Sequence, residues 1–515
     1  MAFVHVKEVG KFGVNRDLSS SELPANVWTD CQNIRFLDGS AYQFYGHGEV
    51  FAGTAVEPYH VLPVTVSGVK SWIYAGATKI YKVAAPGGVI THTDISRTVG
   101  GAYAATKNSW TSTVLGGIPI LNNGVDAPQQ WLLTGNATAL SNWPASTTCA
   151  SLRTFKNMLV ALDVTKSGTR YPYMVKISHP ADPGSVPVTW DPADSTKDAL
   201  EYDISTGYGY IIDGMQLRQS FMIYKTDGCY RMDYTGGAFI VSNQKVLGMS
   251  GALNKNCIVE LDGSHFVLTG SDVIVHDGQQ AVSVLDKQTR RYLFSSIDSE
   301  NIGLCFCFLN PYLNEVFVCY PEPGSTSCNK AMVWNFKDRT ISFRDIPSLN
   351  HAQFGAIDQG LSTTFDADSS PFDSDISSFN SGGFTPGLVS VVMASGDSKL
   401  YQLDSSTTFN GTLPTASLER KGLHFDAPEA IKMVRSVRPK IHGQLGSTVN
   451  VSVGYSNEPY ETPTYSTPIP FTIGTSVSCD CFVSGRYIAL KVESGSAYYW
   501  RFDSYSFDVE QAGAW

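Results

Sequence analysis

The stretch SFMIYKTDGCYRMDY, residues 220–234, holds an apolar run, the pair Asp-Gly and a second run that ends on polar residues. Short apolar runs bounded by turn residues are typical of β-strands in a buried sheet. Asp and Gly tolerate the positive φ of a tight turn, so the pair favours a hairpin with its turn at the centre. The stretch therefore predicts two adjacent antiparallel strands.

Similar units recur along the chain at a spacing of roughly 35 to 60 residues, which is close to the period of propeller blades. They occupy residues 71–83, 113–133, 157–178, 220–234, 265–279, 315–347 and 391–404. A single hairpin cannot bury both of its faces, whereas blades stacked around an axis bury each face against a neighbour. We therefore expect an all-β protein with a β-propeller core of six to seven imperfect blades. A string of β-sandwiches is the alternative.

The pattern divides the chain into three parts. Residues 1–52 are expected to form an N-terminal arm packed on the propeller, and residues 53–405 the propeller itself. Residues 361–387, rich in Ser, Asp and Gly, predict a long inserted surface loop, which we hypothesise gates a channel or contacts fibres. Residues 406–515 predict a β-sandwich-like C-terminal domain. Alternatively, its last strand returns to pair with residues 2–9 and closes the propeller.

Helical periodicity is limited to residues 286–294 and part of residues 21–35. We therefore expect helices to contribute little to the fold.

Composition limits the classes of function. Charged residues make up 16% of the chain, below the roughly 25% of average soluble proteins. The net charge is −10, and no run of Lys or Arg supplies the basic stripe that gripping nucleic acid requires. No window is apolar enough for a membrane-spanning helix, and the first residues do not resemble a signal peptide. We expect an acidic protein with extensive protein–protein contacts and no sequence-specific binding of DNA.

No motif indicates a cofactor, a metal or a catalytic centre. The two Cys-x-Cys pairs, 305/307 and 479/481, could supply four thiolates, but an i, i+2 spacing on a strand favours buried thiols on one face. Asp366 and Asp368 begin like a calcium loop that then lacks its Gly and its closing Glu. We therefore expect no metal site, no cofactor and no enzymatic activity.

The N-terminal segment carries a string of turns and single apolar residues. It contains Gly13-Val14-Asn15, Asp17, Leu23-Pro24, Trp28-Thr29-Asp30, Asn33-Ile34-Arg35-Phe36 and Asp38-Gly39, followed by Gly46-His47. This string resembles the N-terminus of the tail nozzle proteins of short-tailed bacteriophages (podoviruses), also called tail tubular protein B or tail hub and stabilisation proteins. Further matches follow in order at residues 118–131, 331–347 and 485–513.

The resemblance implies a β-propeller with added β domains. It also implies a homohexameric ring below the portal and the tail adaptor, through which double-stranded DNA passes during ejection. Tail fibres or a needle are further partners, and the protein is placed in the virion after assembly in the host cytoplasm. The family is not enzymatic, so no catalytic residue carries over.

Within this interpretation the N-terminal segment is an arm held by structural anchors. These anchors are Leu23, Pro24, Trp28, Asn33, Arg35, Phe36, Asp38 and Gly39. Apolar side chains stabilise a fold only when they are removed from water, so we expect the apolar anchors of this segment to be buried. We expect Arg35 to pair with an acidic residue of a blade.

Two functions from other classes are alternatives. A receptor- or glycan-binding propeller would repeat exposed aromatic residues at one position of each blade, which Trp72, Trp110, Trp131 and Trp334 do not do. A glycoside hydrolase needs two carboxylates across a pocket. The acidic candidates are Asp213, Asp233 and Asp262, and the lone His265 and His276 are expected to be structural.

Overall fold

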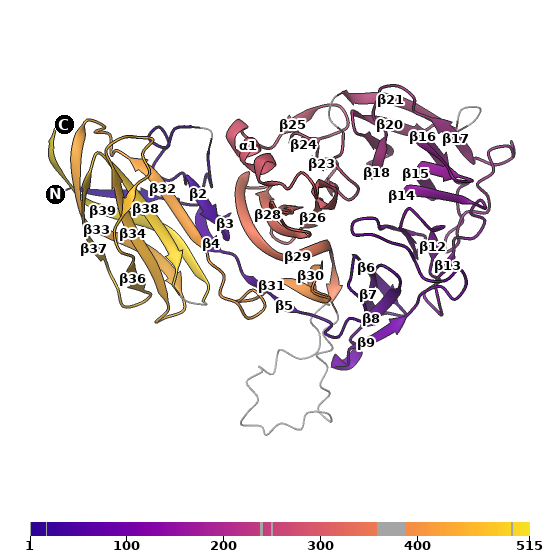
Figure 1. Ribbon diagram of the computed structural model, residues 1–515, viewed down its shortest axis with the longest axis horizontal. Coiled ribbons are helices and arrows are strands. Elements are labelled where there is room, and N and C mark those ends of the chain that lie inside the picture. The colour runs from indigo at the N-terminus through magenta and orange to yellow at the C-terminus, as the bar shows by residue number, and fades with distance from the viewer. Residues whose placement is uncertain are drawn as a thin grey trace, which may run out of the picture.

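The computed structural model describes residues 2–16, 18–236, 240–248, 251–357, 388–495 and 498–514. Strands build two bodies, a ring of blades and a sandwich beside it (Figure 1). The loop predicted at residues 361–387 lies outside the described residues.

Five four-stranded antiparallel sheets follow one another along the chain as blades one to five. Blade one holds β6 (His60–Val66), β7 (Val69–Ala75), β8 (Ile80–Ala84) and β9 (Thr91–Asp94). Blade two holds β10 (Thr111–Leu115), β11 (Ile118–Asn122), β12 (Gln129–Gln130) and β13 (Thr138–Ala139). Blade three holds β14 (Thr147–Phe155), β15 (Met158–Lys166), β16 (Thr169–Ile177) and β17 (Leu200–Asp203). Blade four holds β18 (Ile211–Leu217), β19 (Ser220–Lys225), β20 (Gly228–Tyr234) and β21 (Val241–Gly248). Blade five holds β22 (Ile258–Leu261), β23 (Ser264–Leu268), β24 (Val273–His276) and β25 (Ala281–Ser283).

A seven-stranded sheet supplies two more blades, which brings the described residues to seven blades. Its strands are β26 (Phe306–Asn310), β27 (Glu315–Tyr320), β28 (Cys328–Asn335), β29 (Thr340–Ile357), β30 (Leu388–Ser395), β31 (Lys399–Ser406) and β5 (Gly46–Glu49). The long β29 is shared, because its first part pairs with β28 in blade six and its last part with β30 in blade seven.

The ring closes between blades seven and one. The last part of β29 lies against β6, and one buried apolar cluster joins Val61 and Trp72 of blade one to Val392 and Leu400 of blade seven. The outer strand of blade seven is β5, which comes from the N-terminal segment and pairs with β31. Chain segments from both ends of the propeller therefore share its last blade, as Figure 1 shows.

The hairpin at residues 220–234 is present as β19 and β20, but its turn differs from the expected one. The strands pair from Lys225 to Gly228, so Thr226 and Asp227 make the turn, and Gly228 does not adopt a positive φ. A Cβ at Gly228 would lie 2.7 Å from the Leu247 carbonyl oxygen of β21. The glycine therefore allows the outer strand β21 to approach closely, and the turn itself does not require it.

The sandwich consists of two sheets around an apolar core. The first contains β3 (Ile34–Leu37), β4 (Ser40–Gln43), β39 (Trp500–Ala514), β33 (Ala430–Gly443), β37 (Cys479–Gly485) and β1 (Ala2–Lys7). The second contains β2 (Asp30–Gln32), β32 (Ser417–Leu423), β38 (Tyr487–Ser494), β34 (Thr448–Ser456), β35 (Thr464–Tyr465) and β36 (Ile469–Thr472).

The N-terminal segment therefore differs from an irregular arm laid across the blades. Strands β1 to β4 belong to the sandwich sheets, and β5 belongs to blade seven. The start of the chain does pair with its last strand, β1 with β39, but this pair extends the sandwich and does not close the propeller. The reason is that the outer position of blade seven is already filled by residues 46–49.

The described residues contain one α-helix, α1 (Lys287–Ser296), and two 3₁₀ turns, η1 (Pro86–Gly88) and η2 (Ile302–Leu304). The helix predicted at residues 286–294 is confirmed, and the Asp286 side chain caps it by accepting from the amides of Gln288 and Thr289. The helical piece predicted within residues 21–35 is wrong, because turns and the strands β2 and β3 occupy that range. No helix among the described residues has the length and apolar character needed to cross a membrane.

Candidate functional site

The N-terminal segment forms a junction between the sandwich and blades five and six. One buried apolar cluster runs through it, from Phe502 in the sandwich, through Trp28, Ile34 and Phe36, to Phe343 in the blades. Burying a large apolar side chain contributes about 1.5–3 kcal/mol each. The two bodies thus share one core, and we call this contact region, centred on residues 28–44, the junction.

A buried ionic cluster lies at the centre of the junction. Arg35 on β3 donates from Nε to Glu315 Oε1 at 2.6 Å and from Nη2 to Glu315 Oε2 at 3.0 Å. Its Nη2 also donates to Asp404 Oδ2 at 2.5 Å. Glu315 belongs to blade six and Asp404 to blade seven. The expected pairing of Arg35 with a blade acid is therefore present, and it ties the sandwich strand to two blades at once.

Arg344 completes this cluster from β29. It donates to Asp404 Oδ1 at 2.8 Å and to the Tyr45 carbonyl oxygen at 2.7 Å. The guanidinium groups of Arg35 and Arg344 lie 4.5 and 4.7 Å from the ring centre of Phe44. Although burial raises it, the two ion pairs hold the pKa of Asp404 below its ordinary value. Two cations and two carboxylates leave the cluster with no net charge, as burial requires.

Asn33 fixes the backbone next to this cluster. It is fully buried at φ 54°, a conformation that Asn tolerates better than most residues. Its amide group donates to Asp345 Oδ2 at 2.7 Å and to the Thr415 carbonyl oxygen at 2.9 Å, while its Oδ1 accepts from the Asp345 amide at 2.7 Å. Asn33 therefore joins β29 of the propeller to the chain that enters the sandwich.

The remaining predicted anchors divide into two groups. Leu23 and Trp28 are buried against the sandwich: the Leu23 carbonyl oxygen accepts from Arg420, and Trp28 Nε1 donates to the Val9 carbonyl oxygen. Pro24 and Asp38 are exposed, so they act only in turns. Asp38 and Gly39, at φ 49° and 76°, make the tight turn between β3 and β4.

A second polar network lies on the propeller axis, at the end where the innermost strands begin. His60 on β6 and His351 on β29 are buried with ring centroids 3.9 Å apart. His60 Nε2 forms a hydrogen bond with Ser112 Oγ at 2.8 Å, and His351 Nδ1 accepts from the Val61 amide at 3.4 Å. Burial lowers the pKa of both imidazoles, that of His351 to about 3. The pair is therefore neutral at pH 7.

The network continues through an ion pair between blades three and four. Arg153 on β14 donates to Asp213 on β18 at 2.9 Å from Nε and 2.6 Å from Nη2. Asp213 also accepts from Ser151 Oγ at 2.5 Å and from the Asn256 amide at 3.2 Å. Although burial raises it, Arg153 holds the pKa of Asp213 below its ordinary value. These side chains come from the innermost strands and join adjacent blades.

The acidic and basic residues considered for catalysis are placed apart. Asp213 belongs to the axial network, Asp233 on β20 pairs with Arg231 at 2.9 Å, and Asp262 lies in the turn between β22 and β23. His265 and His276 are buried against the Tyr224 hydroxyl at 2.6 and 2.7 Å, and burial lowers the pKa of each to about 4.

The sulfur and tryptophan candidates are buried. Cys305 and Cys307 lie at blade six, whereas Cys479 and Cys481 lie on β37 of the sandwich, so the two pairs belong to different bodies. No group of ligands that could hold a metal ion occurs among the described residues. Trp72, Trp110 and Trp131 are buried and Trp334 is half-buried. These tryptophans present no repeated platform for sugars.

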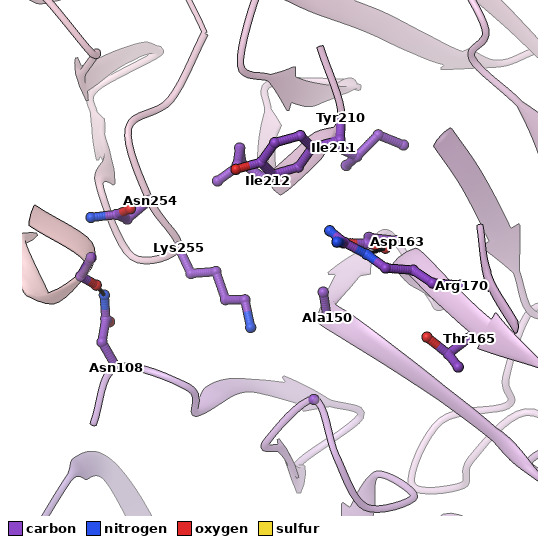
Figure 2. A pocket seen from close by; sticks show the side chains of 12 residues that line it. Asn108, Ala150, Asp163, Thr165, Arg170, Tyr210, Ile211, Ile212, Asn254 and Lys255 are labelled. Carbon is purple, nitrogen blue, oxygen red and sulfur yellow. Dashed lines mark hydrogen bonds and ion pairs between the residues drawn. The ribbon is translucent and has the colours of Figure 1, made fainter. Parts of the chain in front are cut away.

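A pocket of about 360 Å³ opens beside the axial network (Figure 2). Blades two to six contribute to its wall, and its charged residues are Asp163, Arg170 and Lys255. This pocket has little signature in the sequence. The only signal was Asp163, a charge inside the otherwise apolar run of β15.

The sheet order defines this chain as a seven-bladed β-propeller, counted over the described residues, joined to a β-sandwich. No family model matches the chain, and no curated protein matches it. Among solved structures it is similar to a chain from the crystal structure of BBS1N in complex with ARL6DN, at 10% identity and a TM-score of 0.38, over 70% of this chain and 96% of that one. It is also similar to apo AztD from Citrobacter koseri, at 12% identity and a TM-score of 0.31, over 55% of this chain and 85% of that one.

Proposed function

We propose that the chain is a structural virion protein, the distal tail nozzle of a podovirus-like phage. Six copies form a ring that retains the genome and then passes double-stranded DNA during ejection. One observation carries the proposal: Asn33, Arg35 and Phe36, on which the resemblance to nozzle proteins rests, are the residues buried at the junction. A ring subunit made of two bodies needs a fixed angle between them, and these residues supply the contacts that fix it.

The passage in this proposal lies between copies and not through one propeller. The axis of the described propeller is occupied by packed side chains, among them the buried His60 and Asp213 and the half-buried Arg153. A double helix is far wider than the space that such packed side chains leave, so it cannot enter this axis. A ring of several subunits supplies the width that a single chain lacks.

The charge of the chain is compatible with a conduit. Its net charge is −10, and Arg35, Arg153 and Arg344 are engaged in buried ion pairs with carboxylates. A basic wall would bind the phosphates of the duplex by releasing counterions, whereas a mildly negative wall leaves the duplex free to slide. No sequence-specific contact with DNA is needed for this role.

Free sheet edges offer surfaces for contact between copies. Within the described residues, β37 ends the first sandwich sheet on one side, and β1 pairs only with β39 on the other. Phe482 on β37 is 83% exposed and Phe3 on β1 is 52% exposed. Unprotected edges with apolar side chains favour pairing with another chain. We assign these two edges to the subunit interface of the ring.

The other partners of the proposal follow from the same role. The tail adaptor contacts one rim of the ring, and fibres or a needle contact the outside or the exit. The assembled protein belongs to the virion and is built in the host cytoplasm.

Electron microscopy of the purified chain and of virions tests the proposal. We expect a six-fold annulus, and a Phe482→Ser variant should weaken its assembly. Tyr312→Ser, at an aromatic residue that is 82% exposed in the propeller, is the matched control and should assemble normally. A trimeric spike, or a monomer at every concentration in light scattering, would contradict the proposal.

A further inference from the structure

The pocket beside the axial network has a polar, asymmetric wall. Tyr210 and Arg170 line one side, Asn108 and Asn254 the other, and Lys255 extends between them, as Figure 2 shows. Its volume of about 360 Å³ falls at the lower end of the range for small-ligand sites.

The local backbone turns a carboxylate toward this pocket. The pairing of β15 with β16 shifts register between Leu162 and Val164, and Asp163 between them has φ 53°. Such bulges redirect a side chain away from the regular alternation of a strand. Asp163 is buried, and Arg170 donates to both of its oxygens at 2.8 and 2.6 Å. The pair is neutral overall and forms one wall of the pocket.

Lys255 is the charge that this pair leaves uncompensated. It forms no hydrogen bond or ion pair with any residue that the structure describes, although it is only half-exposed. Gly124 lies beside this amino group, since a Cβ there would be in ordinary van der Waals contact with Lys255 Nζ at 3.6 Å. Burial lowers the pKa of this ammonium, although the nearby carboxylates of Asp213 and Asp163 raise it in part. With Arg170 and Asp163, the lining has a net charge of +1.

We propose that this pocket binds a monosaccharide unit that carries one carboxylate, such as a hexuronic acid residue of an acidic polysaccharide. The carboxylate would pair with Lys255 Nζ. The hydroxyls would face the exposed guanidinium of Arg170 and the half-exposed Thr165 hydroxyl. The Tyr210 ring, which is 45% exposed, would cover one face of the sugar.

The charges of the wall exclude the nearest competitors. An inorganic phosphate dianion would bring two negative charges to a wall with one uncompensated cation and a carboxylate. A DNA backbone would need several cations in a row, and the pocket supplies a single free one among the described residues. A neutral sugar would leave Lys255 without a partner. The site does not depend on the proposed ring, because every lining residue belongs to one chain.

Saturation-transfer NMR and calorimetry with the full chain test the inference, with glucuronate, glucose and inorganic phosphate as probes. We expect glucuronate to bind about tenfold or more tightly than glucose, because one charge-assisted contact distinguishes them. Lys255→Met should weaken glucuronate binding by a similar factor. Lys337→Met, at an exposed lysine in the β28–β29 turn, removes the same charge elsewhere and should leave binding unchanged.

A second variant keeps the test independent of the folding of Lys255→Met. Thr165→Glu adds a negative charge at a half-exposed position of the pocket and should also weaken glucuronate binding. Equal binding of glucose, competition by phosphate at equal concentration, or unchanged binding in both pocket variants would overturn the inference. The oligomeric state of each variant, measured in parallel, separates this result from the fate of the proposed ring.

Discussion

The junction and the propeller axis both contain an arginine–carboxylate ion pair, but the two ion pairs connect different parts of the molecule. Each is centred on an arginine that donates twice to one buried carboxylate, Arg35 to Glu315 and Arg153 to Asp213. On the axis the partners lie in adjacent blades, 60 residues apart, whereas at the junction they are 280 residues apart. The axis therefore joins neighbours within one body, and the junction joins two bodies that would otherwise meet only through connecting chain.

The largest expected effect comes from removing the shared cation of the junction. Arg35→Met leaves the buried Glu315 carboxylate without its partner and should lower the free energy of unfolding by about 3–5 kcal/mol. Urea unfolding measures the loss, and small-angle scattering should show a less fixed arrangement of the two bodies. Arg291→Met, at an exposed arginine of α1, is the control and should stay within about 0.5 kcal/mol. A loss below about 1 kcal/mol for Arg35→Met would show that packing alone holds the junction.

Acid should affect the axial network more than the Arg35 cluster, because the axial network contains the buried neutral pair of His60 and His351. The pKa of His60 and that of His351 lie below the unfolded value, so the unfolded chain binds more protons below pH 6.5 and stability falls as pH falls. At pH 5.5 the two groups together should cost about 3 kcal/mol. In the Arg35 cluster, the pKa of Asp404 is lowered, so its contribution is lost only toward pH 4 and below. Burial raises the pKa of Glu315, so protonation of this carboxyl on acidification does not add to the loss of stability.

Unfolding experiments at pH 7.5 and 5.5 measure this difference. His47, His265 and His276 are also buried with lowered pKa values and add to the total. The contribution of the axial pair is therefore measured by comparing the wild type with His351→Asn. Between pH 7.5 and 5.5 the variant should lose about 1.4 kcal/mol less stability than the wild type, because it has one titrating histidine fewer. An identical pH dependence in this variant would contradict the prediction.

Asn33 tests whether hydrogen bonds without charge also hold the junction. Asn33→Ala removes three hydrogen bonds. It also places alanine at φ 54°, where alanine has no polar side chain to offset the steric cost of its Cβ. The expected loss is about 2 kcal/mol in the free energy of unfolding. Asn33→Gly tolerates the same backbone and isolates the hydrogen-bond contribution. If both variants match the wild type, the Asn33 contacts contribute nothing measurable.

The blades could be predicted because their middle strands are buried on both faces. The seven units found in the sequence correspond to the second and third strands of the seven described blades, and β15, for example, is buried from Met158 to Val164. The outer strands β9, β13 and β25 are short and exposed, so no apolar pattern marked them. The local hydrophobic pattern of a sequence indicates which residues are buried, and few residues of the outer strands are buried.

The junction could be predicted only in part. The apolar anchors and the basic character of Arg35 indicated burial against an acidic partner, but nothing local in the sequence identifies Glu315 or Asp404 at such separations. The same limit applies to Lys255, whose neighbours in the pocket come from five blades. Long-range pairing depends on sheet order, which a single sequence does not specify.

The smallest expected effect distinguishes the two kinds of residue within the N-terminal motif. Asp38 is exposed in the tight turn between β3 and β4 at φ 49°, and Asn tolerates that conformation equally well. Asp38→Asn should therefore change the free energy of unfolding by less than about 0.5 kcal/mol. Ring assembly, measured by light scattering, should also be unchanged. A large loss of assembly in Asp38→Asn would mean that this carboxylate contacts a neighbouring copy, so that the motif would serve the interface between subunits as well as the junction within one.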